Sequence, residues 1–214
     1  MKLIDISVPV DEQSPHWPGD PGIKVKPFFN HKNDGFHLTQ ITFHSHAGTH
    51  IDAPYHFYED GLKIKDIPLE KFFISAKVVE YSGTNDISQE FIATLDLDDV
   101  QAILFKTSNS RWWQNPNEPF HEDFIALDQS AALAFVNKGL TLVGIDYFSI
   151  EAYESVNHEV HQILLENNIL ILENLDINDV KPGNYQLVCF PLNIDSDDAG
   201  LVRAVLVCNA RLET

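Results

Sequence analysis

Four short, almost continuously apolar runs in the second half of the chain constrain its fold more than any other feature. They are LTLVGID at 140–146, ILILENL at 169–175, NYQLVCFPL at 184–192 and LVRAVLVC at 201–208. Runs of this length with little polar alternation are typical of strands that are buried on both faces. The sequence therefore predicts a sheet that is covered by other elements.

Two helices are predicted next to these strands. Residues 127–139 have apolar side chains at helical spacing, with Asp128 as the N-cap and Gly139 as the stop. Residues 157–168, NHEVHQILLENN, predict a second helix that is capped by Asn157. Strands that alternate with helices indicate β-α-β units in this half of the chain.

The first half is richer in strands. They are predicted at residues 3–10, 36–46, 76–81 and 100–107, and the second of these alternates strictly between polar and apolar residues. The chain has 214 residues, and neither an internal repeat nor a Gly/Ser-rich linker divides it. We therefore expect a single domain over residues 1–214, of the mixed α/β class.

Charge excludes several classes of partner. The 14 Lys and Arg residues against 32 Asp and Glu residues give a net charge of −18, which repels phosphate backbones and anionic lipid. Neither nucleic acid nor a membrane surface is therefore expected as a partner. A membrane-spanning segment is not expected either, because no apolar run reaches the ~18 residues that span a bilayer. The start, MKLIDISVPVDEQ, alternates like a strand and does not resemble a signal peptide. Cys189 and Cys208 lie in apolar runs and are predicted to be reduced core thiols, which favours a cytoplasmic location.

The segment HSHAGTHIDAPYHF, residues 44–57, contains four histidines and an aspartate. His46 and His50 have the i, i+4 spacing of ligands on one helix face, but Gly48 lies between them and Pro54 follows. We therefore predict a tight loop that leaves the strand at 36–46 and lets several side chains converge.

Imidazole and carboxylate are ligands of zinc, manganese and iron. His46, His50 and Asp52 could supply three ligands, with His56 nearby. His44 is expected either to donate a hydrogen bond to a ligand without binding the metal itself or to be an ordinary strand residue. The alternative interpretation is a polar turn that happens to be rich in histidine.

Two later residues are candidates for the same site. Glu173 ends an apolar run, where an unpaired buried carboxylate would be costly, and His161 borders the apolar face of the second predicted helix. Each alone is more often a satisfied polar residue. Together they form the second carboxylate–imidazole pair that a second metal ion would need.

Residues 111–123, RWWQNPNEPFHED, predict a long loop because they contain two prolines and no periodicity. Trp112 and Trp113 either line a pocket or pack against a flank of the domain. The sequence favours neither alternative.

Several segments together resemble the cyclase family of metal-dependent hydrolases, which includes kynurenine formamidases and isatin hydrolases. HAGTHIDAPYH at 46–56 matches the family pattern H-x-G-T-H-x-D-x-P-x-H in full, and WPGDP at 17–21 matches its N-terminal element. GIDYFSIE, HQILL, ILENL and PGNYQLVCFPL follow in the family's order. The chain departs from the family near its C-terminus, where DDAGLVRAV at 197–205 replaces a DGSPAR-like segment and only Arg203 and the strand after it are clearly kept.

The resemblance implies a swivelling β/β/α-type fold and a homodimer or larger assembly. It also implies a role for each candidate residue: His46, His50 and Asp52 as ligands of a first metal, Asp52 and Glu173 as carboxylates shared with a second, and His161 as a ligand of the second. His56 matches the catalytic acid/base, and Trp17 matches an aromatic residue of the substrate pocket.

The function predicted on this basis is hydrolysis of a small aromatic amide, most simply by an arylformamidase that uses one or two Zn²⁺ or Mn²⁺ ions per chain. The alternative substrate is a lactam or lactone of the isatin type. More distant alternatives are a facial-triad iron oxygenase, which would be expected on a jelly roll, and a metal-binding protein without activity.

Overall fold

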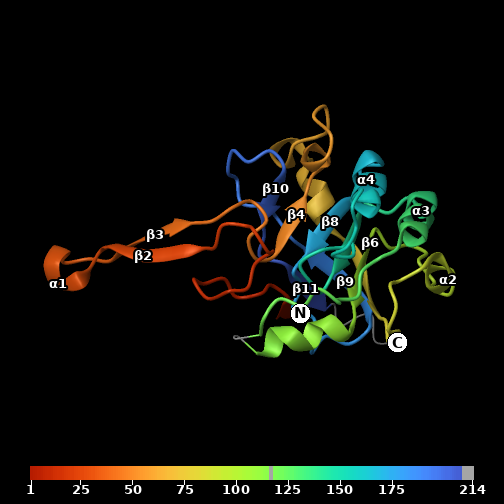
Figure 1. The fold of residues 1–214 in the computed structure, drawn as a ribbon, viewed down its shortest axis with the longest axis horizontal. Helices are drawn as coiled ribbons and strands as arrows, with labels where there is room; N and C mark the ends of the chain where they lie inside the picture. Colours follow the sequence, from red (N-terminus) through yellow and green to blue (C-terminus); the bar gives the residue numbers. More distant parts are fainter. Residues whose placement is uncertain (116–117, 209–214) are drawn as a thin grey trace.

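The computed structural model describes residues 1–115 and 118–208 and contains a nine-stranded mixed sheet (Figure 1). Strands β5 to β8 are parallel to their neighbours in this group, and the other pairings are antiparallel. The strand order is β1 (Lys2–Asp5), β11 (Val205–Cys208), β9 (Gly183–Val188), β5 (Phe73–Glu80), β6 (Ala102–Lys106), β7 (Leu142–Ile145), β8 (Leu170–Glu173), β4 (His50–Asp52) and β10 (Ala199–Leu201). The predicted mixed α/β class is confirmed, and the parallel centre of the sheet excludes the jelly roll expected for an iron oxygenase.

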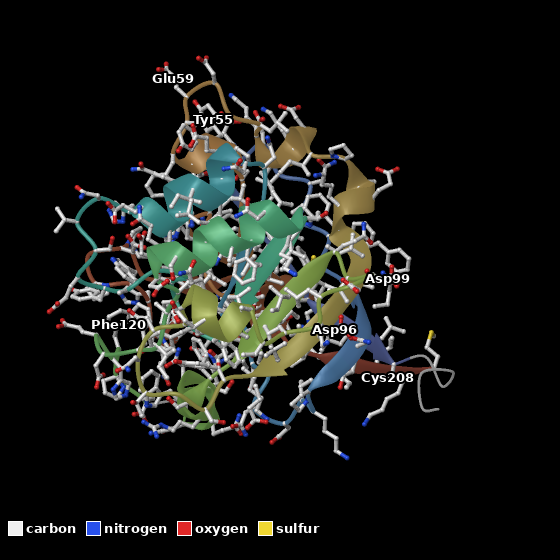
Figure 2. The ribbon with its side chains drawn as sticks, turned by 90° about the vertical axis from the view of Figure 1, so that its right-hand side faces the viewer. Tyr55, Glu59, Asp96, Asp99, Phe120 and Cys208 are labelled. Atoms are coloured by element: carbon white, nitrogen blue, oxygen red, sulfur yellow. The ribbon has the colours of Figure 1, made fainter. Side chains whose placement is uncertain are left out.

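Alternation along the central strands directs their side chains into two clusters of the core. In β6, Ala102 and Leu104 belong to one cluster, and Ile103 and Phe105 belong to the other. The second cluster lies under helices α2 (Gln89–Ile92), α3 (Gln129–Lys138) and α4 (Glu159–Glu166), which lie in front of the sheet in Figure 2. The first cluster joins strands from both ends of the strand order, so the sheet curls around it.

The predicted single strand at 201–208 is wrong. The structure has two strands there, β10 and β11, which pair with β4 and β9 at opposite ends of the strand order. Burial on both faces is also wrong for β9 and β11, in which only Leu187 and Leu206 are buried. The reason is that the helices cover β5 to β8 and leave the outer faces of β9 and β11 to solvent.

One of the two predicted helix starts is correct. Asp128 accepts a hydrogen bond from the backbone N–H of Ala131 at 2.9 Å, and Gly139 ends α3 in the left-handed region with φ 69°. The N-cap of α4 is His158, with φ 51° and no side-chain cap hydrogen bond, so the predicted cap Asn157 is wrong.

Residues 24–42 form an arm that projects from the body of the molecule (Figure 1). Strand β2 (Lys24–Phe29) pairs with β3 (Leu38–Thr42), and α1 (His31–Asp34) lies between them. The predicted strand at 36–46 therefore exists in shortened form. All residues of β3 are exposed, so its alternation does not mark a buried face in this chain.

Among the described residues, every helix is too short or too polar to cross a bilayer.

The two predicted caps give a matched test of the fold. Asp128→Ala should lower the free energy of unfolding by about 1 kcal/mol, because it removes the side-chain acceptor at the start of α3. Asn157→Ala should change it by less than ~0.5 kcal/mol, because Asn157 is exposed and does not cap α4. Urea denaturation of both variants measures the difference, and equal losses would contradict the assignment.

Candidate metal centre

The pairing of β4 with β8 places three of the predicted site residues together. His50 lies opposite Glu173 in the antiparallel register. On β4, Ile51 points into the cluster inside the curl, so His50 and Asp52 point to the opposite, helix-covered face. The prediction of a loop through this segment is wrong for residues 50–52, which form a strand.

The turn before β4 depends on Gly48. This residue has φ 61°, and a Cβ atom there would lie 2.3 Å from Cγ2 of Val10. Its carbonyl oxygen accepts hydrogen bonds from Nδ1 of His50 at 2.8 Å and from the side-chain amide of Asn174 at 3.0 Å. The turn is thereby fixed both to β4 and to the residue that follows Glu173.

Thr49 ties the same turn to two other segments. Its hydroxyl donates to the carbonyl of Asn174 at 2.6 Å and accepts from the backbone N–H of Val8 at 2.9 Å. This buried network fixes the position of the histidine motif relative to the end of β8.

The five predicted metal ligands converge on one point. Nδ1 of His46 lies 3.0 Å from Oδ1 of Asp52, and Nε2 of His50 lies 3.3 Å from the same oxygen. Glu173 is within 3.4 Å of His50 Nε2 through Oε2 and within 3.4 Å of His161 Nε2 through Oε1. His161 Nε2 is 3.9 Å from Oδ2 of Asp52. Only His46 has a side chain that is more than a tenth exposed, at 22%.

Asp52 provides the test of whether these atoms fit a cation. Both of its oxygens are buried, and neither has a hydrogen-bond partner among the described residues, although imidazole nitrogens lie at 3.0 and 3.3 Å. The nitrogens of His46 and His50 also face each other at 3.1 Å. The imidazole nitrogens near Asp52 are thus close enough for hydrogen bonds but do not have the angles of hydrogen bonds. Carboxylate oxygens and imidazole nitrogens that converge in this way fit a divalent cation.

The carboxylates and imidazoles of this site shift each other's pKa values. Burial alone would lower the pKa of His50 and of His161, but the surrounding carboxylates outweigh burial and raise the pKa of each to about 10. The pKa of His46 rises to about 9 for the same reason, mainly through Asp52 and Asp198. Burial opposes ionisation of Asp52, yet His46 and His50 hold its pKa well below the usual value. Because metal ligands must be deprotonated, protons compete with a cation for this site.

His56 lies beside these five residues, and its pKa is shifted in the opposite direction to that of His46, His50 and His161. It ends the short 3₁₀ helix Pro54–His56, and its ring centroid lies 4.3 Å from that of His46. Burial and the neighbouring imidazoles lower the pKa of His56, although Asp52 opposes this shift. A neutral imidazole at neutral pH can accept a proton.

A pocket of about 450 Å³ opens over these residues. Trp17 lines it and packs against Phe120, Phe124 and Tyr153. His44 also lines the pocket and lies outside β3, so it is not a strand residue. The aromatic wall can accept a flat apolar ring.

Trp112 and Trp113 do not line this pocket but a second, smaller cavity of about 90 Å³ beside it, which shares Phe148 with the first. Trp112 stacks on His121 with centroids 4.0 Å apart, and Nε1 of Trp113 donates to the carbonyl of Asp146 at 2.8 Å. Trp112 and Trp113 both lie in the 3₁₀ helix Ser108–Gln114, where the sequence predicted a loop. Residues 116–117 of that predicted loop lie outside the described residues.

A sequence model of the Cyclase family, described as "Putative cyclase", matches residues 4–152. A kynurenine formamidase of Salinibacter ruber is 33% identical over 209 residues, which cover 96% of this chain and 97% of that protein. The chain belongs to the Cyclase family.

Solved structures agree with this membership. A protein described as a potential metal-dependent hydrolase with cyclase activity has a TM-score of 0.83 at 32% identity, over 96% of each chain. An isatin hydrolase bound to thioisatinate has a TM-score of 0.79 at 17% identity, over 97% of this chain and 93% of that one, which shows the shared fold.

Two carboxylates of this cyclase-family site were missed by sequence reasoning. Glu151 accepts from Nδ1 of His161 at 2.7 Å, and Asp198 lies 3.1 Å from Nε2 of His46. Glu151 ends the segment GIDYFSIE, where an acid after a mostly apolar run could have signalled it. Asp198 lies in the acidic run DSDD, and nothing in the sequence distinguishes it from its neighbours.

Glu173→Gln tests whether Glu173 is a metal ligand. The amide keeps an oxygen for the hydrogen bond that Oε1 accepts from the backbone N–H of Ile150 at 2.7 Å, but it loses the charge. We expect affinity for zinc to fall by more than the 10–100-fold that is typical of residues that only orient a ligand. Competition with a chromophoric chelator measures it, with Glu166→Gln on the exposed end of α4 as the control. Equal affinities in the two variants would mean that Glu173 is not a ligand and only caps the end of β8 by accepting the hydrogen bond from Ile150.

Proposed function

We propose that this protein is a metal-dependent hydrolase of a small aromatic amide, an arylformamidase that acts on substrates of the N-formylkynurenine type. The observation that carries the proposal is the convergence of His46, His50, Asp52, His161 and Glu173 beneath an aromatic pocket. The related protein from Salinibacter ruber, which covers nearly the whole chain, is named a kynurenine formamidase, and this supports the choice of a formamide.

The proposed ligands are His46 and His50 for one ion and His161 for a second, with Asp52 and Glu173 shared between the two. Among these residues, His50, Asp52 and Glu173 each have a donor atom within 4.8 Å of the others. Nitrogen and oxygen donors without cysteine suit Zn²⁺ and Mn²⁺ alike. A divalent ion bound here supplies a Lewis acid that polarises a carbonyl and activates water.

The protein's own side chains perform the remaining steps of the proposed reaction. Trp17 and its aromatic neighbours bind the ring of the substrate and place the amide over the buried carboxylates. His56, which borders the same pocket, takes the proton from the attacking water on a ring nitrogen and passes it to the leaving nitrogen of the amide. The lowered pKa of His56 leaves that ring free to accept the proton at neutral pH.

The substrate proposal is tested by turnover with metal-stripped protein to which zinc or manganese is added back separately. N-formylkynurenine and simple aryl formamides should be hydrolysed only after metal is restored, and isatin should be a poorer substrate. Turnover of isatin or a lactone without turnover of any formamide would overturn the substrate assignment but keep the hydrolase. Bound metal without turnover of any amide, lactam or lactone would indicate a protein that has lost its activity.

The proposed role of His56 is tested by His56→Ala. The variant should keep its metal and its fold while kcat falls by roughly 10²–10⁴-fold, the range of general acid–base catalysis. The pH–rate profile should also lose one limb. Loss of metal would instead make His56 a ligand, which its distance from His46 and Asp52 permits. Near-complete activity would reduce His56 to a wall of the pocket.

We further propose that the protein is a homodimer in which the arm at residues 24–42 packs on the partner. A two-stranded hairpin on its own is marginally stable in water, and this one exposes large apolar side chains. Phe28 is 60% exposed, Phe36 52% and Ile41 56%. A second copy of the chain would cover this surface.

Ile41→Asp tests the dimer. Sedimentation velocity should show a shift from dimer to monomer, because the change places a charge in the proposed interface. Leu69→Asp is the control, since Leu69 is 65% exposed on the body of the molecule. A wild-type monomer, or a dimer that survives Ile41→Asp unchanged, would contradict the arm as the interface.

We also infer a cytoplasmic location. Cys189 and Cys208 are both free, and burial raises the pKa of the Cys189 thiol to about 12, as expected for an unreactive core thiol.

A further inference from the structure

Each of the three imidazoles at the metal centre directs one ring nitrogen inward and the other toward an acceptor. His50 directs Nε2 inward, and its Nδ1 lies 2.8 Å from the carbonyl oxygen of Gly48. His161 also directs Nε2 inward, and its Nδ1 lies 2.7 Å from Oε2 of Glu151. His46 has the opposite orientation, with Nδ1 inward and Nε2 at 3.1 Å from Oδ2 of Asp198.

These outer acceptors determine which nitrogen can bind a cation. A neutral imidazole has one N–H donor and one lone pair. An acceptor at the outer nitrogen favours the N–H there, which leaves the lone pair on the inner nitrogen. His50 and His161 therefore match the Nδ1–H form, and His46 matches the Nε2–H form.

The two acidic acceptors come from outside the histidine motif, and each is itself fixed. Glu151 is 3% exposed, and its Oε1 accepts from the backbone N–H of Val160 at 2.8 Å and from the hydroxyl of Ser155 at 3.0 Å. Asp198 accepts from the hydroxyl of Ser45 at 2.8 Å through the same oxygen that faces His46. Both carboxylates are thus oriented toward the outer nitrogen of a proposed ligand.

Glu151 has an alternative role as a metal ligand, because Glu151, His158 and His161 also have donor atoms within 4.8 Å of one another. The 2.7 Å separation of Glu151 Oε2 from His161 Nδ1 is the length of a charge-assisted hydrogen bond, which requires a proton between the two atoms. The exposed side chain of His158 is farther away, at 3.7 Å from Oε2. The contacts favour an orienting carboxylate over a third metal site.

We propose that Glu151 and Asp198 are positioning residues that hold His161 and His46 in opposite tautomers, so that both lone pairs face Asp52 and Glu173. This inference rests on the proposed metal-dependent function. Carboxylates in this arrangement fix the ring and raise the basicity of the ligand, and their loss typically costs 10–100-fold in metal affinity. The carbonyl of Gly48 fixes the tautomer of His50 without a charge.

The tautomers are tested directly by NMR of the zinc-loaded protein with ¹⁵N-labelled histidine. Long-range ¹H–¹⁵N correlations should place the retained proton on Nδ1 of His161 and on Nε2 of His46. A proton on the opposite nitrogen of either ring overturns the proposal for that residue. This readout does not depend on the substrate or on turnover.

Zinc affinity provides the second readout. Glu151→Gln and Asp198→Asn should each weaken binding by about 10–100-fold in chelator competition. Their controls are Glu154→Gln, an exposed acid in the same segment as Glu151, and Asp197→Asn, whose side chain pairs with Lys63 at 2.7 Å. Affinities equal to those of the controls overturn the proposal.

Ser155→Ala tests whether a loss of zinc affinity comes from the contact between Glu151 and His161 or from a disturbance of the segment around residues 151–155. It removes one of the two contacts that fix Glu151 Oε1 but leaves the backbone N–H of Val160 and the Oε2 contact to His161 in place, so zinc affinity should fall much less than in Glu151→Gln. A loss as large as that of Glu151→Gln would overturn the positioning role of Glu151. Failure of the wild type to bind zinc would overturn the proposed function as well, whereas equal affinities in variants and controls would overturn this inference alone.

Discussion

The register between β4 and β8 is the constraint on which the rest of the site depends. It places His50 opposite Glu173 and, through the alternation of side chains, turns both residues and Asp52 to the face that α4 covers. A shift of one residue in either strand would move its polar side chains into the apolar interior of the curl. The apolar residues Ile51 and Leu172, which point into that interior, therefore help to fix the arrangement of the candidate metal centre.

The local parts of this arrangement could be predicted from the sequence. The motif at 46–56 supplies residue types that suit a divalent cation, and the cap of α3 follows from Asp128 and Gly139. Glu173 and His161 were identifiable because a carboxylate and an imidazole are out of place beside apolar runs. In each case the signal is a conflict between the chemistry of a side chain and the expected burial of its neighbours.

The parts that could not be predicted depend on contacts between distant segments. Whether the run at 201–208 is one strand or two depends on the curl of the sheet, which separates its halves between β4 and β9. The start of α4 lies at His158 in a left-handed conformation, which local cap preferences do not anticipate. Asp198 approaches His46 across 152 positions of the chain, and its acidic neighbours conceal it in the sequence.

The position of β10 has a consequence for the order in which the protein can assemble during synthesis. Strand β10 (Ala199–Leu201) forms the edge next to β4, and Ala199 lies opposite Asp52. The histidine motif at 46–56 is synthesised long before β10, so its strand β4 gains its second neighbour only after residue 201 has been made. Because such distant pairings form slowly, the motif stays apart from His161, Glu173 and Asp198 while the intervening residues are made, and the converging side chains reach their final geometry only after β8 and β10 have been synthesised.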